Sequence, residues 1–320
     1  MSSLLVIGGS GFFGKSILDA YHRGLLQQWN INSIFILSRN ASKLKSTNPD
    51  LLSNTVELID ADITCCKSIP FADFVIHAAA SSDERRYLES SEEERRNIIA
   101  GTYNYINLAK IFHQKSKIIY VSSGAVYGDQ PIDVLRVPEN YASHDLANSI
   151  VQNKKAYALA KRDSENLISK LGSDGLEVSI ARCFAFIGPY LPRDQHFAIG
   201  NFIEDALHGR AIEVKAQHQV FRSYMYADDL VSWLMTIASS ASSKCPIFNV
   251  GSDIAVEIRD LALMISEKYA VQVRTSSVIY GSQADRYIPD IQKARLNLGL
   301  KINYELDEAI SITLARLANK

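Results

Sequence analysis

The sequence predicts an α/β fold in which a doubly wound parallel sheet is followed by a smaller C-terminal lobe. Two observations lead to this prediction. In the first half of the chain, short apolar runs alternate with longer helical stretches, a pattern typical of parallel strands covered by helices on both faces. A glycine-rich loop at residues 8–14 joins the first apolar run to the first helical stretch.

The first half contains six predicted strands and three predicted helices. The strands are the short apolar runs at residues 4–7, 34–37, 56–59, 74–77, 117–121 and 177–181. The helices are the longer stretches at 11–28, 98–113 and 154–171. The helix at 98–113 carries apolar residues on more than one face, so we expect it to be largely buried.

The alternation of strands and helices breaks after Arg182, where Gly188-Pro189 and Pro192 mark turns. Beyond this point we expect helices at 202–208, 228–238, 257–269 and 306–318, and one strand at 247–250. This pattern suggests a chain that leaves the sheet domain and then re-enters it. We therefore assign residues 1–183 and about 225–250 to the sheet domain, and about 184–224 and 251–320 to the C-terminal lobe.

Composition and charge exclude several classes of protein. The formal net charge is -1, which argues against a main role in binding nucleic acid or an anionic membrane. No segment approaches the ~20 consecutive apolar residues of a membrane helix, and the first apolar run is too short for a signal peptide. We expect free thiols in a reducing cytoplasm, and no metal site, because C-x-x-C spacing is absent from the four cysteines Cys65, Cys66, Cys183 and Cys245.

The glycine-rich loop has the spacing of a dinucleotide-binding loop. Gly8, Gly11 and Gly14 stand three residues apart between a predicted strand and a predicted helix. Glycines at these points permit a tight turn and a close approach of the backbone to a pyrophosphate, while the N–H groups at the start of the helix attract the anion. The predicted cofactor-binding residues of this loop are Gly8, Ser10, Gly11, Phe12, Phe13 and Gly14.

The residues after the second and third predicted strands indicate which dinucleotide binds. Ser38 and Arg39 stand where an acidic residue usually holds the ribose 2′-hydroxyl of NAD. A small residue followed by arginine suits the 2′-phosphate of NADP, so we expect a preference for NADP(H), with NAD(H) also possible. A surface arginine that begins a loop is the alternative. Asp62 and Ile63 are further candidates, with Asp62 either binding adenine or capping its own loop.

A tyrosine, a lysine and a serine form a candidate catalytic set. Tyr157 and Lys161 are four residues apart in a predicted helix, so their side chains share one face. A lysine cation at this spacing can lower the pKa of a phenol from its usual value of about 10, which makes tyrosine a usable acid and base near neutrality. Ser123 follows the fifth predicted strand, at the sheet edge where doubly wound folds bind ligands. Each feature alone also fits an ordinary helix or polar loop.

Together, these features closely resemble the extended short-chain dehydrogenase/reductase family of nucleotide-sugar epimerases, dehydratases and 4-ketoreductases. Further motifs extend the resemblance over nearly the whole chain: H-A-A-A at 77–80, N-x-x-x-G-T at 97–102, R-x-x-x-x-x-G-P at 182–189, R-S-Y-x-x-A-x-D-L at 222–230, F-N-V-G at 248–251, and a final motif at 286–299. The resemblance implies a Rossmann fold, a nicotinamide cofactor and a nucleotide-diphosphate sugar as substrate. It also implies a homodimer formed through helices near 84–113 and 150–171.

The resemblance also assigns roles to individual residues. Ser123 corresponds to the catalytic serine, Tyr157 to the acid and base, and Lys161 to the residue that binds the nicotinamide ribose and tunes Tyr157. Arg222 and Arg286 fall where the family holds the nucleotide diphosphate, a task that suits guanidinium forks. Surface ion pairs are the alternative for both arginines. The family's cofactor also contacts the segment that matches Ala78, Ala79 and Ala80.

Three departures from the family pattern bear on the reaction. Ala185 replaces an asparagine that often binds substrate, and the stretch between Tyr127 and Tyr157 is longer than usual. Gly124 and Ala125 stand where 4,6-dehydratases carry an Asp-Glu pair that removes a proton and expels a hydroxyl. We therefore expect an NADPH-dependent 4-ketoreductase of deoxysugar biosynthesis, acting on a 4-keto-6-deoxy nucleotide sugar. The alternatives are a nucleotide-sugar 4-epimerase and, from a different class, a non-catalytic NADP-binding regulator.

Overall fold

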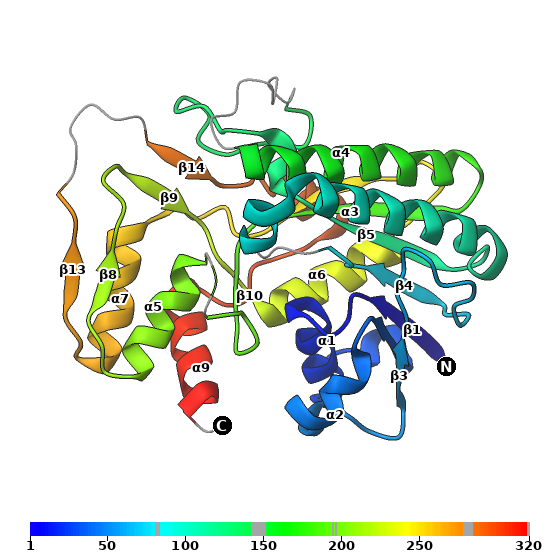
Figure 1. Ribbon diagram of the computed structural model, residues 1–320, viewed down its shortest axis with the longest axis horizontal. Coiled ribbons are helices and arrows are strands. Elements are labelled where there is room, and N and C mark those ends of the chain that lie inside the picture. The colour runs from blue at the N-terminus through cyan, green and yellow to red at the C-terminus, as the bar shows by residue number, and fades with distance from the viewer. Residues whose placement is uncertain (81–83, 142–151, 194, 196, 278–283, 319–320) are drawn as a thin grey trace. The chain divides into compact units, whose positions relative to one another are not determined.

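The computed structural model describes residues 1–318 apart from 81–83, 142–151, 194, 196 and 278–283, and gives only the backbone at 84–88 and 152–154 (Figure 1). The chain divides into two compact units. The first unit comprises Met1–Val126, Asp145–Cys183 and Val231–Phe248, and the second comprises Tyr127–His144, Phe184–Leu230 and Asn249–Lys320.

The first unit is built on a seven-stranded sheet with the order β11-β6-β5-β4-β1-β2-β3. Its strands are β1 (Ser2–Ile7), β2 (Ile31–Ser38), β3 (Val56–Asp60), β4 (Phe74–His77), β5 (Lys117–Ser123), β6 (Glu177–Cys183) and β11 (Ile247–Val250). Strands β1 to β6 pair in parallel, and the direction of winding reverses between β1 and β4. This confirms the predicted doubly wound sheet, in which ligands bind at the carboxyl ends of the strands beside the reversal.

Helices cover both faces of this sheet (Figure 1). Helix α1 (Phe12–His22) lies on one face, and α3 (Glu84–Phe112) and α4 (Gln152–Ser173) pack against each other on the other face. Alternate strand residues such as Leu5 and Ile7 are fully buried beneath α3 and α4. Helix α1 ends before its predicted end at 28, because Gly24 adopts a φ of +79° and turns the chain away. Short α2 (Leu44–Thr47) follows β2.

The second unit contains short strands and most of the remaining helices. The helices are α5 (Ala198–Leu207), the first residues of α6 (Ala227–Ser239), α7 (Ile258–Tyr269), α8 (Gln292–Leu298) and α9 (Leu306–Ala318). The strand groups are β12 (Val256–Glu257), β9 (Val220–Arg222) and β14 (Asp285–Tyr287); β13 (Val273–Thr275) and β8 (Ile212–Val214); and β10 (Met225–Tyr226) and β7 (Phe186–Ile187). Strands of two or three residues show no periodicity that a sequence reader could detect. Among the described helices, none combines the length and apolar character needed to cross a bilayer.

The segment that follows Val126 belongs to the second unit, whereas the sequence placed it in the sheet domain. Buried Asn249 explains the difference. Its side-chain oxygen accepts a hydrogen bond from the Tyr127 hydroxyl at 2.7 Å, and its side-chain amide donates to the Val137 carbonyl at 2.8 Å. The backbone N–H of Asn249 donates to the Glu139 carboxylate at 2.8 Å. These contacts join parts of the chain that are more than a hundred residues apart.

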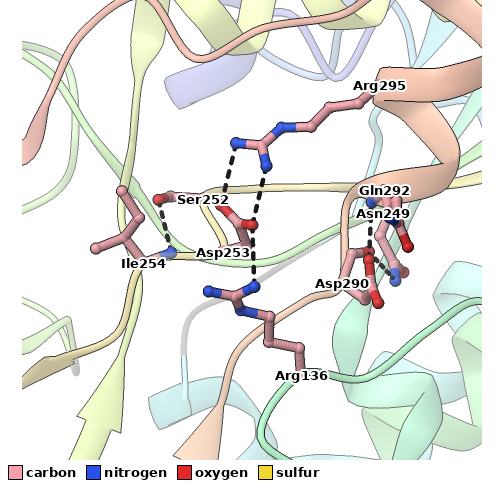
Figure 2. A network of polar contacts seen from close by, with 8 residues as sticks. All are labelled: Arg136, Asn249, Ser252, Asp253, Ile254, Asp290, Gln292 and Arg295. Atoms are coloured by element: carbon pink, nitrogen blue, oxygen red, sulfur yellow. Dashed lines mark hydrogen bonds and ion pairs between the residues drawn. The ribbon is translucent and has the colours of Figure 1, made fainter.

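An ion-pair network holds the same segment (Figure 2). The nearly buried carboxylate of Asp253 lies 3.2 Å from the Arg295 guanidinium in α8 and 3.5 Å from the Arg136 guanidinium. Close by, Asp290 accepts a hydrogen bond from the backbone N–H of Gln292 at the start of α8. The loop that begins a few residues after Ser123 is thus held by residues from the C-terminal part of the chain.

Candidate active site

The glycine-rich loop connects β1 to α1 and packs closely against the backbone of β2 and of the segment after β4. The N–H of Gly8 donates to the Leu37 carbonyl in β2 at 2.8 Å, and its φ of +86° is one that favours glycine. A Cβ at Gly8 would lie 2.7 Å from the Ala79 backbone, and one at Gly14 would lie 1.9 Å from the Gly9 carbonyl oxygen. Close packing of backbone against backbone therefore requires glycine at both positions, and this packing shapes the tight turn that leads into the N-terminus of α1.

The alanine segment after β4 lies beside this loop, as the motif predicts. The N–H of Ala78 donates to a carbonyl at the end of β1 at 2.8 Å. Ala80 belongs to a small apolar cluster with Ile98, Ala160 and Tyr157. The segment thus lies next to both the glycine-rich loop and the helix that bears Tyr157.

The ends of β2 and β3 carry the residues expected to contact the adenosine half of a dinucleotide. The Ser38 hydroxyl oxygen is buried and hydrogen-bonds nothing within the described part of the chain, while Arg39 beside it is exposed. The Asp62 carboxylate accepts from the backbone N–H of Thr64 at 2.9 Å, which is the loop-capping contact that the sequence left open. Ile63 is buried in the core.

Two lysines that the sequence analysis did not single out interact electrostatically, although they lie on different elements. Lys15 lies in α1, and Lys43 ends a short 3₁₀ turn that follows β2. Burial lowers the pKa of Lys15, and the positive charge of Lys43 lowers it further. An anion bound between the two amines would relieve this repulsion. The sequence gives no signal for the pair, because the two lysines lie on different elements.

Ser123, Tyr157 and Lys161 all lie in the first unit. Ser123 ends β5, is nearly buried, and its hydroxyl oxygen accepts from the Ala125 N–H at 3.2 Å. The Lys161 ammonium lies 5.8 Å from the centre of the Tyr157 ring, one turn earlier in α4. Lys161 also donates to the Val121 carbonyl oxygen at 2.7 Å. This bond fixes the tyrosine–lysine face of α4 to the end of β5 that carries Ser123.

The two residues that follow Ser123 in the sequence are not acidic. Gly124 and Ala125 begin a 3₁₀ turn and carry no ionisable side chain. Opposite Ser123 in β6 lies Cys183, where burial raises the pKa of the thiol well above its usual range and keeps it protonated. No group of three His, Cys, Asp or Glu residues in the described ranges could hold a metal ion.

The two predicted substrate-binding arginines lie on neighbouring strands of the second unit, and their environments differ. Arg222 in β9 forms an ion pair with Asp285 at 2.7 Å, which is the alternative that the sequence left open for it. Arg286 in β14 lies over the Phe221 ring at 4.3 Å, and its buried Nε has no hydrogen-bond partner in the described structure. Arg286 is therefore the better candidate to bind an anion.

The chain is similar to known proteins in sequence and in fold. The chain is 26% identical over 314 residues to UDP-glucuronic acid decarboxylase 1 of Danio rerio, covering 97% of this chain and 71% of that protein. It has the fold of a dTDP-glucose 4,6-dehydratase from Streptomyces venezuelae solved with NAD, with a TM-score of 0.81, 21% identity, and coverage of 99% and 97%. A UDP-glucose 4-epimerase from Thermotoga maritima, solved with UDP-glucose, gives a TM-score of 0.79, 19% identity and 99% coverage of both chains.

The family assignment follows from a match along most of the chain. Residues 4–251 match the NAD dependent epimerase/dehydratase family. This range contains the glycine-rich loop, Ser123 and the Tyr157–Lys161 pair, on which the predicted resemblance rested. The match therefore confirms that prediction, and the protein belongs to the NAD-dependent epimerase/dehydratase family.

Proposed function

We propose that this protein is an NADPH-dependent 4-ketoreductase that acts on a 4-keto-6-deoxy nucleotide sugar. One observation carries the proposal: Ser123, Tyr157 and Lys161 lie around one strand end, and the positions after Ser123 are Gly124 and Ala125. With a hydride supplied by a nicotinamide cofactor, hydroxyl groups and a lysine cation can provide the proton and charge stabilisation that interconvert a ketone and an alcohol. Removing a proton from carbon and expelling a hydroxyl would require a further acid and base.

The first unit fits a nicotinamide dinucleotide. The tight glycine turn leads into the N-terminus of α1, whose N–H groups can bind a pyrophosphate, and the buried Ser38 hydroxyl lacks a hydrogen-bond partner in the described part of the chain. The cofactor would supply the hydride that reduces the ketone carbon. We assign its binding to the glycine-rich loop, the alanines after β4 and the ends of β2 and β3.

Side chains of the protein would stabilise the negative charge that develops on the ketone oxygen and would protonate that oxygen. Tyr157 donates its phenolic proton to this oxygen, and the Ser123 hydroxyl donates a hydrogen bond to it. The Lys161 cation, fixed by the Val121 carbonyl, stabilises the phenolate that Tyr157 becomes. In the second unit, Arg286 would bind the nucleotide diphosphate, while Arg222 is held by Asp285.

Net reduction is expected when 4-keto-6-deoxy nucleotide sugars are supplied with NADPH. A reductase exchanges its cofactor at each turnover, whereas an epimerase keeps one molecule and returns the hydride to the same carbon. Loss of near-ultraviolet absorbance by NADPH measures the reaction, and we expect one cofactor oxidised per product. Interconversion of two 4-hydroxy epimers without net oxidation of added cofactor would instead establish the epimerase.

We also propose that two copies of the chain form a homodimer through α3 and α4. Helix α3 leaves Tyr103 and Ile111 largely exposed, although it packs against α4 along another face. Large apolar side chains at such positions favour burial against a second copy. Sedimentation equilibrium should give twice the chain mass at micromolar concentration, and a 35.6 kDa species there would contradict the dimer.

A further inference from the structure

A second tyrosine contacts Lys161 from the sheet side. Tyr120 in β5 is fully buried, and its hydroxyl oxygen accepts a hydrogen bond from the Lys161 ammonium at 3.4 Å. The ammonium also lies 4.9 Å from the centre of the Tyr120 ring. Lys161 is itself nearly buried and donates to the Val121 carbonyl at 2.7 Å. Two of the three ammonium donors are thus directed at adjacent residues of β5.

The Tyr120 hydroxyl lies near two other hydroxyl groups. The side chains of Ser164 in α4 and Thr102 in α3 lower the pKa of Tyr120, but burial outweighs them. These two hydroxyl oxygens lie 3.0 Å apart, and the Thr102 hydroxyl lies 2.9 Å from the Ile98 carbonyl oxygen. Burial raises the pKa of Tyr120 to about 12, so the phenol stays protonated near neutrality. Lys161 therefore faces a neutral oxygen.

Within the described residues, the charged and titratable groups near Lys161 form no ion pair with its ammonium. Glu165 follows Lys161 by one helical turn, a spacing at which ion pairs are common. Its carboxylate instead binds the Arg182 guanidinium at 2.7 Å. His77 is neutral, because burial and then the Lys161 charge lower its pKa to about 3. Cys183 is also neutral, since burial raises the pKa of its thiol.

We propose that Tyr120 is a positioning residue for the Tyr157–Lys161 pair. Its hydroxyl and the Val121 carbonyl fix the lysine through neutral oxygens, so the full cationic charge acts on the Tyr157 phenol. A carboxylate in place of these acceptors would offset that charge. An apolar side chain at position 120 would leave the ammonium short of an acceptor and free to move. This inference rests on the roles proposed above for Tyr157 and Lys161, and it names what holds the lysine.

The test is a titration of Tyr157 in the full chain carrying Tyr120→Phe, which removes one oxygen and keeps the ring. The ionisation of Tyr157 is isolated as the near-ultraviolet difference between each protein and the same protein with Tyr157→Phe. We expect the midpoint to rise by about one pH unit, a tenfold weaker acid, because the cation is less well fixed. The titration needs no substrate, so it is independent of which sugar is reduced.

Tyr105→Phe is the matched control. Tyr105 is also fully buried and lies against His77, with ring centroids 4.9 Å apart, but its hydroxyl bonds His113 at 3.3 Å. We expect this control to leave the midpoint unchanged. An unchanged midpoint in Tyr120→Phe, or an equal rise in the control, would overturn the inference.

Two further outcomes have defined meanings. If Tyr120→Phe does not fold, Ser164→Ala tests the same array by removing a hydroxyl group near that of Tyr120. A rise of the midpoint in that variant supports the inference, and no rise overturns it. Failure to reduce any 4-keto sugar, with the expected titration, would refute the proposed reaction and leave the positioning role of Tyr120 standing.

Discussion

Tyr157→Phe should lower kcat at least ~100-fold while cofactor affinity stays within about twofold. The phenylalanine keeps the ring that packs against the Ile98–Ala160 cluster, so we expect the local structure of α4 to be preserved. It removes the phenolic hydroxyl that gives its proton to the ketone oxygen in the proposed reaction. Lys161 keeps its bond to the Val121 carbonyl and remains available to the cofactor ribose.

Two measurements separate the chemical role of Tyr157 from a structural one. Steady-state kinetics with NADPH and a 4-keto-6-deoxy nucleotide sugar gives kcat, and fluorescence titration with NADPH gives the cofactor affinity. Tyr103→Phe, which removes a hydroxyl from an exposed tyrosine of α3, provides the control and should leave kcat near the unmodified value. A near-normal kcat in Tyr157→Phe would remove this residue from the proposed mechanism.

The sheet was predictable from the sequence because its signals are local. Each strand of the first unit is a short apolar run. Buried parallel strands of this kind can be predicted from the local sequence, without knowing which strands pair with them. Strand β11 was placed at 247–250, where the structure has it. The small strands of the second unit, such as β9 and β14, are defined instead by pairing between distant residues. Such strands have no pattern of their own within two or three residues.

The site was predictable to the same extent. The glycine-rich loop and the Tyr157–Lys161 pair follow from spacing within one element. The partners of the site residues do not follow from such spacing. Tyr120 contacts Lys161 from a different element, and Asp285, 63 residues further along the chain, forms an ion pair with Arg222. The placement of the segment after Val126 was likewise decided by Asn249, which no local pattern connects to it. Contacts of this kind depend on the fold.

NADPH should bind about 10- to 150-fold more tightly than NADH, the equivalent of one charge-assisted contact of about 1.5–3 kcal/mol. Position 38 carries a serine and therefore lacks the carboxylate that would repel a 2′-phosphate. The exposed Arg39 supplies a cation beside Ser38. The fold adds Lys15 and Lys43, whose mutual repulsion favours an anion between them. Asp60, which pairs with Ser38 across β2 and β3, opposes this preference, because the hydroxyl and the N–H of Ser42 lower the pKa of its carboxyl and keep it negatively charged.

Titration calorimetry with 2′,5′-ADP and 5′-AMP isolates the phosphate from the rest of the cofactor. Arg39→Ala should reduce the affinity for 2′,5′-ADP at least tenfold and leave that for 5′-AMP unchanged, because only the former carries the 2′-phosphate. Lys43→Ala should act in the same direction and more weakly. Lys45→Ala is the matched control, since the Lys45 charge acts on Asp60, and it should change neither affinity by more than about twofold. Equal or tighter binding of NADH by the unmodified protein would contradict both the preference and the role of Arg39, because the cations Arg39, Lys15 and Lys43 would then gain nothing from the phosphate.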